Sequence, residues 1–128
     1  MTLDSSALVA IVFAEAGHLG LIDRILAADQ VRITAPTLVE TGLVVAGRRR
    51  ASDVRDLDGL VQELGITVVP FGEREWHTAI DAFLRFGRGR HKAALSFGDC
   101  LAYASAVTAN DALLFVGDHF AQTDVTPA

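Results

Sequence analysis

Apolar residues along the chain follow two alternating spacings, one typical of short strands and the other typical of amphipathic helices. Apolar residues three or four positions apart, bounded by glycine, proline or capping residues, predict helices over 5–15, 18–29, 36–50, 52–64, 73–86 and 96–109. Short apolar runs predict strands over 1–3, 31–34, 66–69 and 112–116. Because strands and helices alternate, we expect an α/β fold, an α/β/α sandwich with a short-stranded, mainly parallel central sheet flanked by helices.

The length and composition narrow the class of protein. The chain has 128 residues, of which 51% are apolar, so it fits a single domain over 1–128 and is too apolar to be disordered. The single cysteine, Cys100, excludes an intrachain disulfide and a cysteine-based zinc cluster, and is typical of a reducing compartment. No uncharged apolar run reaches the roughly 18–20 residues that cross a bilayer, and no targeting segment stands out. We therefore expect a cytoplasmic protein that does not enter a membrane.

Four acidic residues stand in segments that the apolar pattern predicts to be buried. Asp4 follows the first predicted strand and Asp118 follows the last, whereas Glu40 and Asp99 lie on predicted helices, far from any other charge. A lone buried carboxylate is costly unless it is neutralised or paired. Since parallel strands end at one edge of the sheet, we expect the four carboxylates to converge there.

A divalent cation is the simplest explanation for such a convergence. Mg²⁺ and Mn²⁺ prefer oxygen ligands, and ions held by carboxylates can activate water and clamp a phosphate. Taken singly, Asp4 and Asp118 also suit caps or turns, and Asp99 suits the first turn of its helix, where the helix dipole favours an acid. Glu40 has no capping role in the middle of its helix. The four acids together therefore favour a metal site.

The segments around these acids also form a recognisable set. They are Met-Thr-Leu-Asp-Ser-Ser-Ala-Leu (1–8), Pro-Thr-Leu-Val-Glu-Thr-Gly (36–42), Leu-Ser-Phe-Gly-Asp-Cys-Leu-Ala-Tyr-Ala (95–104), Leu-Leu-Phe-Val-Gly-Asp-His-Phe (113–120) and Thr-Asp-Val (123–125). None of these motifs is specific alone. In this order and over the whole chain, they resemble the PIN-domain ribonucleases, and within them the VapC-type toxins of bacterial toxin–antitoxin pairs.

This resemblance implies a PIN-like fold and a metal-dependent endoribonuclease. Asp4, Glu40, Asp99 and Asp118 would bind one or two Mg²⁺ or Mn²⁺ ions, and a metal-activated water would cleave structured RNA, mostly tRNA, leaving a 3′-hydroxyl and a 5′-phosphate. The resemblance also implies a homodimer and a cognate VapB-type antitoxin that covers the active site.

The resemblance also implies roles for two further residues, Ser6 and Asp124. Ser6 would orient Asp4 by a hydrogen bond, although it suits the start of the following helix equally well. The fourth acid is the most variable position of the family, and Asp118 is the best candidate for it. Asp124 is a second candidate, either as an alternative ligand or as a support to the first.

The charge balance argues against binding RNA through bulk charge, since eleven Lys and Arg stand against sixteen Asp and Glu, a net charge of −5. The cations are nevertheless clustered, in 48–50 and in the glycine-containing segment 85–92. We expect RNA phosphates to contact the second cluster, which contains Arg85, Arg88, Arg90, His91 and Lys92. The alternative for 85–92 is a solvated helix end and loop, and the cations of 48–50 also suit a helix C-terminus.

The apolar helical segments 7–26 and 37–46 exceed what one small sheet needs for cover, so we expect a dimer interface or an antitoxin groove there.

Two other classes of protein remain as alternatives. A receiver-type signalling domain would need a lysine after its next-to-last strand, whereas the only lysine, Lys92, precedes a helix. A catalytically inactive PIN-like interaction module is the other alternative, and the retention of all four acids argues against it.

Overall fold

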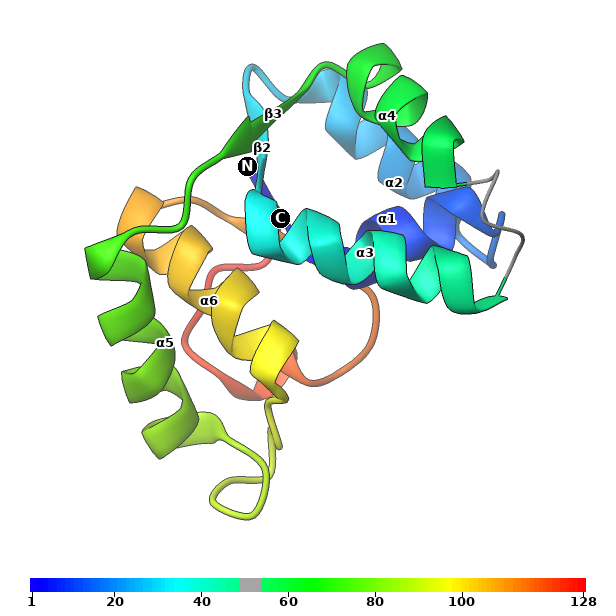
Figure 1. Cartoon of the computed structure of the whole chain (residues 1–128). Coiled ribbons are helices and arrows are strands. Elements are labelled where there is room, and N and C mark those ends of the chain that lie inside the picture. The colour runs from blue at the N-terminus through cyan, green and yellow to red at the C-terminus, as the bar shows by residue number, and fades with distance from the viewer. Residues whose placement is uncertain (49–53) are drawn as a thin grey trace.

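The computed structural model describes residues 1–48 and 54–128, which are built around a sheet of four short strands (Figure 1). The strands are β1 (Thr2–Leu3), β2 (Val31–Thr34), β3 (Ile66–Val69) and β4 (Leu113–Leu114). They lie in the order β3-β2-β1-β4 and pair in parallel, with Thr2 opposite both Arg32 and Leu113. The predicted α/β fold with a parallel central sheet is confirmed.

All six predicted helices are present. They are α1 (Ser5–Val12), α2 (His18–Ala27), α3 (Ala35–Arg48), α4 (Val54–Glu63), α5 (Glu73–Phe86) and α6 (Phe97–Ala109), and an unpredicted 3-10 helix follows at Phe120–Gln122. The first helix ends at Val12 rather than at Glu15, because the chain turns through two left-handed residues, Ala14 (φ 50°) and Gly17 (φ 86°), into α2. The first two residues of the helix predicted over 52–64 lie outside the described residues.

The strand β4 is shorter than the predicted strand over 112–116. Its ladder partner β1 has only two residues, so only Leu113 and Leu114 find partners there. The C-terminal segment covers the other edge of β4, where the Leu113 N–H donates to the Thr126 carbonyl at 2.8 Å and the Ala128 N–H donates to the Leu113 carbonyl at 3.0 Å. Among the described helices, none has the length and apolar character needed to cross a membrane.

The sheet separates two apolar cores. One core joins the sheet to α1, α2 and α4 and includes Leu8, Ile25 and Ile33, while the other joins α5, α6 and the C-terminal segment and includes Tyr103 and Phe120. Figure 1 shows this division, with α5 and α6 on one side of the sheet and α1, α2, α3 and α4 on the other. The helix α3 contacts both α1 and α6, so it bridges the two halves. Three of the predicted acids belong to these three contacting helices or their caps.

Candidate active site

Asp4 stands between β1 and α1 and is almost entirely buried, with 3% of its surface exposed. It is the N-cap residue of α1, since its Oδ2 accepts hydrogen bonds from the Ser6 backbone N–H at 3.0 Å and from the Ser6 hydroxyl. Its Oδ1 is also buried and has no hydrogen-bond partner among the described residues. Helix capping therefore accounts for one oxygen of this carboxylate and leaves the other unexplained.

Ser6 links the first strand of the sheet to the last. Its hydroxyl donates to Asp4 and accepts a 3.0 Å hydrogen bond from the Val116 backbone N–H, just beyond β4. The Asp4 backbone N–H donates in turn to the Leu114 carbonyl at 3.0 Å. These bonds hold the Asp4 carboxylate in one orientation, which is the role that the sequence resemblance implies for Ser6.

Glu40 lies in the middle of α3, and its carboxyl group rests against Gly98 at the start of α6. Its Oε2 is buried without a hydrogen-bond partner within the described chain, and the side chain of Ser5 lies near enough to the carboxyl group to lower its pKa. The sequence pattern does not identify Ser5 or Gly98 as site residues. Their only signal is that each adjoins a predicted acid in the chain.

Asp99 lies in the first turn of α6, whose N-cap is Ser96. The Ser96 N–H donates to Asp99 Oδ2 at 2.7 Å, and the Asp99 N–H donates to Ser96 Oγ at 3.2 Å, which completes a capping box. The ring nitrogen Nδ1 of His119 lies 3.6 Å from the same Oδ2. The two contacts of the Asp99 carboxylate both involve Oδ2, so they leave its Oδ1 for another ligand.

The three acids lie close enough to act on one another electrostatically. Burial raises the pKa of Asp4, the Ser6 hydrogen bonds oppose this, and the negative charge of Asp99 adds to it. Burial likewise raises the pKa of Glu40, against the opposing effect of Ser5, and the charges of Asp4 and Asp99 raise it further. The ionised carboxylates are therefore costly as a group, and a cation bound beside them would offset the cost.

The acids fit a cation that keeps part of its water shell. In the described part of the chain, no group of three or more Asp, Glu, His or Cys side chains is arranged to hold a metal ion by itself. Mg²⁺ does not require such a cage, because one or two carboxylates commonly hold it while it retains several waters. The two buried oxygens without partners, Asp4 Oδ1 and Glu40 Oε2, are donors of the kind that this ion prefers.

The two candidates for the fourth acid have different surroundings. Asp118 is exposed beyond β4, and its charge is not among those that raise the pKa of the other acids. Asp124 accepts a 2.5 Å hydrogen bond from the Tyr103 hydroxyl and forms a 2.6 Å ion pair with Arg85, and these contacts lower its pKa. The structure thus brings three predicted acids together, leaves Asp118 in solvent, and gives Asp124 other partners.

The basic segment leads from the end of α5 to the first turn of α6, where Asp99 lies. Arg88, Arg90 and Lys92 are exposed, as expected for residues that contact RNA. Arg85 differs from them, because its guanidinium forms the 2.6 Å ion pair with Asp124. The Arg90 guanidinium lies over the Phe83 ring, 5.5 Å from its centroid, while all three side chains remain exposed.

The other described residues of the two basic clusters contact neighbouring residues of the protein. His91 is partly buried, and its Nδ1 accepts a 3.1 Å hydrogen bond from the Ala93 N–H inside the loop. Arg48 forms a 3.0 Å ion pair with Glu15, and the remaining residues of its cluster, 49–50, lie outside the described chain. These contacts give His91 a role in shaping the loop and place Arg48 at the C-terminus of α3.

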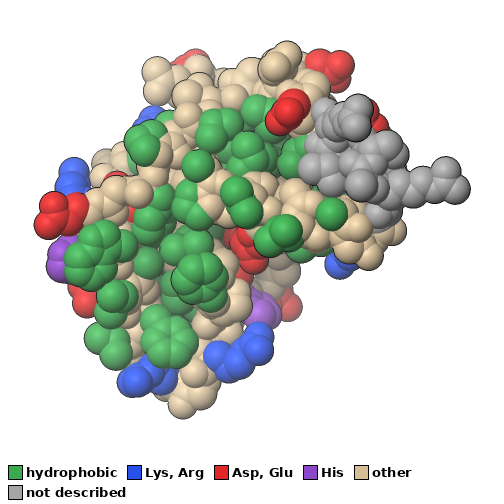
Figure 2. Space-filling view, in the orientation of Figure 1, with side chains coloured by type: hydrophobic (Ala, Val, Ile, Leu, Met, Phe, Trp, Pro, Cys, Tyr) green, Lys and Arg blue, Asp and Glu red, His purple; other side chains and the backbone are tan. Residues whose placement is uncertain are grey.

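Apolar side chains are exposed on two parts of the surface. Within the predicted segments 7–26 and 37–46 they are Leu19, Leu26, Val39 and Leu43, whereas residues 7–11 belong to the core. The second part is an apolar groove of about 350 Å³ between α5 and α6, lined by Phe71, Trp76, Ala79, Ile80, Phe83, Phe97, Cys100 and Leu101. Figure 2 shows the apolar side chains gathered over these two helices. The apolar pattern of α5 and α6 did not predict this groove.

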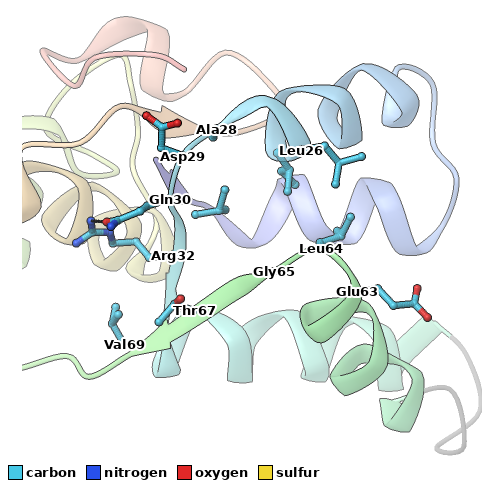
Figure 3. A pocket seen from close by; sticks show the side chains of 12 residues that line it. Leu26, Ala28, Asp29, Gln30, Arg32, Glu63, Leu64, Gly65, Thr67 and Val69 are labelled. Carbon is cyan, nitrogen blue, oxygen red and sulfur yellow. Dashed lines mark hydrogen bonds between the residues drawn. The ribbon is translucent and has the colours of Figure 1, made fainter.

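A larger pocket, of about 650 Å³, lies where β2 and β3 begin, at the opposite end of the strands from Asp4. Figure 3 shows Asp29, Gln30 and Arg32 along the β2 side of this pocket. Arg32 is already paired with Asp111 at 2.9 Å. None of the predicted site residues lines the pocket, so the acids define the candidate active site.

Comparisons with known proteins agree with the fold and identify the family. Residues 1–125 match the family model of the PIN domain. Ribonuclease VapC36 of Mycobacterium tuberculosis is 40% identical over 126 residues, which cover 98% of this chain and 91% of that protein. Ribonuclease VapC28 of the same organism is 38% identical over 129 residues, covering 100% of this chain and 97% of that protein. The chain therefore belongs to the PIN-domain family and, within it, to the VapC ribonucleases, which excludes the receiver-type alternative.

Solved structures have the same fold. VapC20 of Mycobacterium tuberculosis, described as a toxin that cleaves the sarcin–ricin loop, matches with a TM-score of 0.79 at 14% identity, over 99% of this chain and 97% of that one. VapBC2 of Rickettsia felis, bound to a DNA fragment from its promoter, matches with a TM-score of 0.75 at 11% identity, over 99% and 96% of the two chains. At these identities the likeness is one of fold.

Replacing Glu40 by glutamine is expected to stabilise the metal-free chain at neutral pH. A carboxyl group whose pKa is raised by folding destabilises the fold when ionised; this penalty is absent below its ordinary pKa of 4.5 and grows as the pH rises to the folded-state value. In EDTA, E40Q should raise the melting temperature by roughly 2–5 °C at pH 7 and change it little at pH 4. Calorimetry measures both shifts, and D81N, at an exposed acid of α5, is the control. A shift of the same size at both pH values would show that burial and neighbouring charge are not its cause.

Proposed function

We propose that this chain is the toxin of a toxin–antitoxin pair, a metal-dependent endoribonuclease that acts in the cytoplasm on structured RNA, with tRNA as the expected class. Its membership of the VapC ribonucleases supports the ribonuclease activity. The observation that carries the metal dependence is the pair of buried carboxylate oxygens, on Asp4 and Glu40, that no donor reaches within the described residues. A catalytically inactive interaction module would gain nothing from buried carboxylates without partners, whose burial costs free energy.

Asp4, Glu40 and Asp99 are the residues that would hold the ion, with Asp118 as the proposed fourth ligand from the exposed loop after β4. The chemistry that bound Mg²⁺ or Mn²⁺ supplies is activation of water and stabilisation of phosphate charge during in-line cleavage of a phosphodiester. The serine partners of Asp4 and Asp99 fix one oxygen of each carboxylate by hydrogen bonds. The second oxygen of each therefore stays available without a change in backbone position.

RNA binding is proposed to use the exposed cations between α5 and α6. Arg88, Arg90 and Lys92 lie in the segment that leads into the first turn of the Asp99 helix, and this order supports a path for RNA phosphates toward the acids. The net charge of −5 includes the acids of the site, whose charge a bound cation would offset. VapC20, which shares the fold, is described as cleaving the sarcin–ricin loop, and this supports an RNA substrate.

Two protein partners are proposed, a VapB-type antitoxin and a second copy of this chain. The antitoxin is supported by structural neighbours that are VapBC or toxin–antitoxin complexes. For the homodimer we propose the apolar groove between α5 and α6, because Trp76, Ile80 and Phe97 expose 46%, 52% and 81% of their surface there. The exposed leucines and valine of α2 and α3 remain available to the antitoxin.

Asp99→Asn is expected to abolish metal-dependent RNA cleavage while the fold persists. The asparagine oxygen can still accept the Ser96 N–H bond, but the side chain lacks the charge that holds a cation. In Mn²⁺, the cleavage rate of a labelled tRNA pool should fall by about 10²-fold or more. Circular dichroism checks the fold, and D81N should cut as fast as the parent. Parent-like cleavage by D99N, or cleavage by the parent that persists in EDTA, would disprove the proposed chemistry.

Replacing Arg88 and Lys92 together by glutamine is expected to weaken RNA binding most at low salt. Each lost phosphate contact should lower the slope of log affinity against log salt by about 1. Fluorescence anisotropy with labelled RNA in EDTA, over a series of KCl concentrations, measures the slope. Arg74→Gln, an exposed cation at the other end of α5, is the matched control and should keep the parent slope. A double variant with the parent slope would place the RNA elsewhere.

Ile80→Glu is expected to convert the proposed homodimer into monomers, since it buries a charge in the middle of the apolar groove. Light scattering of the parent should give twice the chain mass of 13.6 kDa, and the variant should give that mass once. Leu43→Glu, at a 69% exposed position on α3, is the control and should remain dimeric. A monomeric parent would refute the dimer, and a dimeric I80E variant would refute this interface.

A further inference from the structure

Gly98 differs from other helical glycines in what surrounds it. A Cβ built at Gly98 collides with the two carboxyl oxygens and the carboxyl carbon of Glu40. At Gly20, Gly47 and Gly59, which also lie in helices, a Cβ has no neighbouring atom within 4 Å. The space that a side chain would take at Gly98 is therefore filled by one group, the Glu40 carboxylate.

Backbone conformation does not explain a glycine at this position. Gly98 is the second residue of α6 and does not have the positive φ angle that favours glycine, unlike Gly17 and Gly65. Helix propensity alone favours alanine over glycine here. The packing against Glu40 is thus the remaining reason for the absence of a side chain.

The close approach at Gly98 decides where the Glu40 carboxylate sits. It lies against the first turn of α6, where the helix dipole favours negative charge, and next to the residue that precedes Asp99. Its neighbours include the charges of Asp4 and Asp99, which repel it. A side chain at Gly98 would displace the Glu40 carboxylate from this place.

We propose that Gly98 is a positioning residue of the site: the absence of a side chain there admits the Glu40 carboxylate beside Asp99, and this placement sets how tightly the three acids hold a divalent cation. The inference rests on the proposed metal site and adds to it a residue that contacts no ion itself. It acts entirely through Glu40, so removal of the Glu40 side chain must cancel the effect of any change at Gly98.

A double-mutant cycle tests this dependence. The four proteins are the parent, G98A, E40A and G98A/E40A. Isothermal titration with Mn²⁺ should show that G98A weakens binding about tenfold or more in the parent and has no effect in the E40A background. Melting temperatures in EDTA give a second readout: the gain that alanine brings to a helix should be present in the E40A background and absent in the parent. Gly59→Ala is the matched control and should leave Mn²⁺ binding unchanged.

The possible outcomes separate the two claims. Parent-like Mn²⁺ affinity in G98A, or an equal loss in both backgrounds, would overturn the role of Gly98 while leaving the metal site intact. A G98A protein that fails to fold, beside a folded G98A/E40A protein, would show the same collision and support the proposal. A parent chain that binds no Mn²⁺ would instead overturn the proposed metal site, and with it any role of Gly98 in cation binding.

Discussion

The structure depends on one constraint: it holds carboxylates in positions where burial and neighbouring negative charge disfavour their ionised form. Asp4 and Glu40 each bury an oxygen that no donor in the described chain reaches, and Asp99 adds like charge to both. Flexible side chains would escape this cost by turning to solvent. Here the capping bonds of α1 and α6 and the two cores on either side of the sheet hold them in place. Rigid elements of this kind let a site keep an arrangement that is unfavourable until its ligand binds.

The order of strands and helices follows from the apolar spacing, because each helix packs one face against the sheet or a neighbouring helix. The spacing fails where the outcome depends on more than a local pattern. The first helix ends early because Ala14 takes a left-handed conformation, which alanine rarely adopts. The last strand is shorter than its apolar run because β1, its partner, has only two residues. Whether a segment forms a helix or a strand thus follows from its own apolar spacing. The residue at which the element ends does not follow from that spacing.

The residues of the candidate site also divide into those that a local sequence pattern reveals and those that it does not. Asp4, Glu40 and Asp99 could be found from the sequence, since an isolated charge in an apolar segment is visible without a structure. Asp118 has the same signature, but the loop after β4 leaves the sheet and exposes it. The two partners of Asp124, Arg85 and Tyr103, lie 39 and 21 residues away in the chain, at distances that no motif covers. Packing contacts such as the one that admits Glu40 to the start of α6 leave no mark in the sequence beyond a small residue.

The hydrogen bond from the Val116 N–H to the Ser6 hydroxyl joins residues that are 110 positions apart. The orientation of the first acid therefore depends on a segment that is made 110 residues after Ser6. Contacts of such long sequence separation form late, because most of the chain must be ordered before they can close. A growing chain on the ribosome carries Asp4, Glu40 and Asp99 well before it can arrange them. The orientation of Asp4 thus waits for the segment around Val116, so translation order separates the synthesis of the three acids from their arrangement.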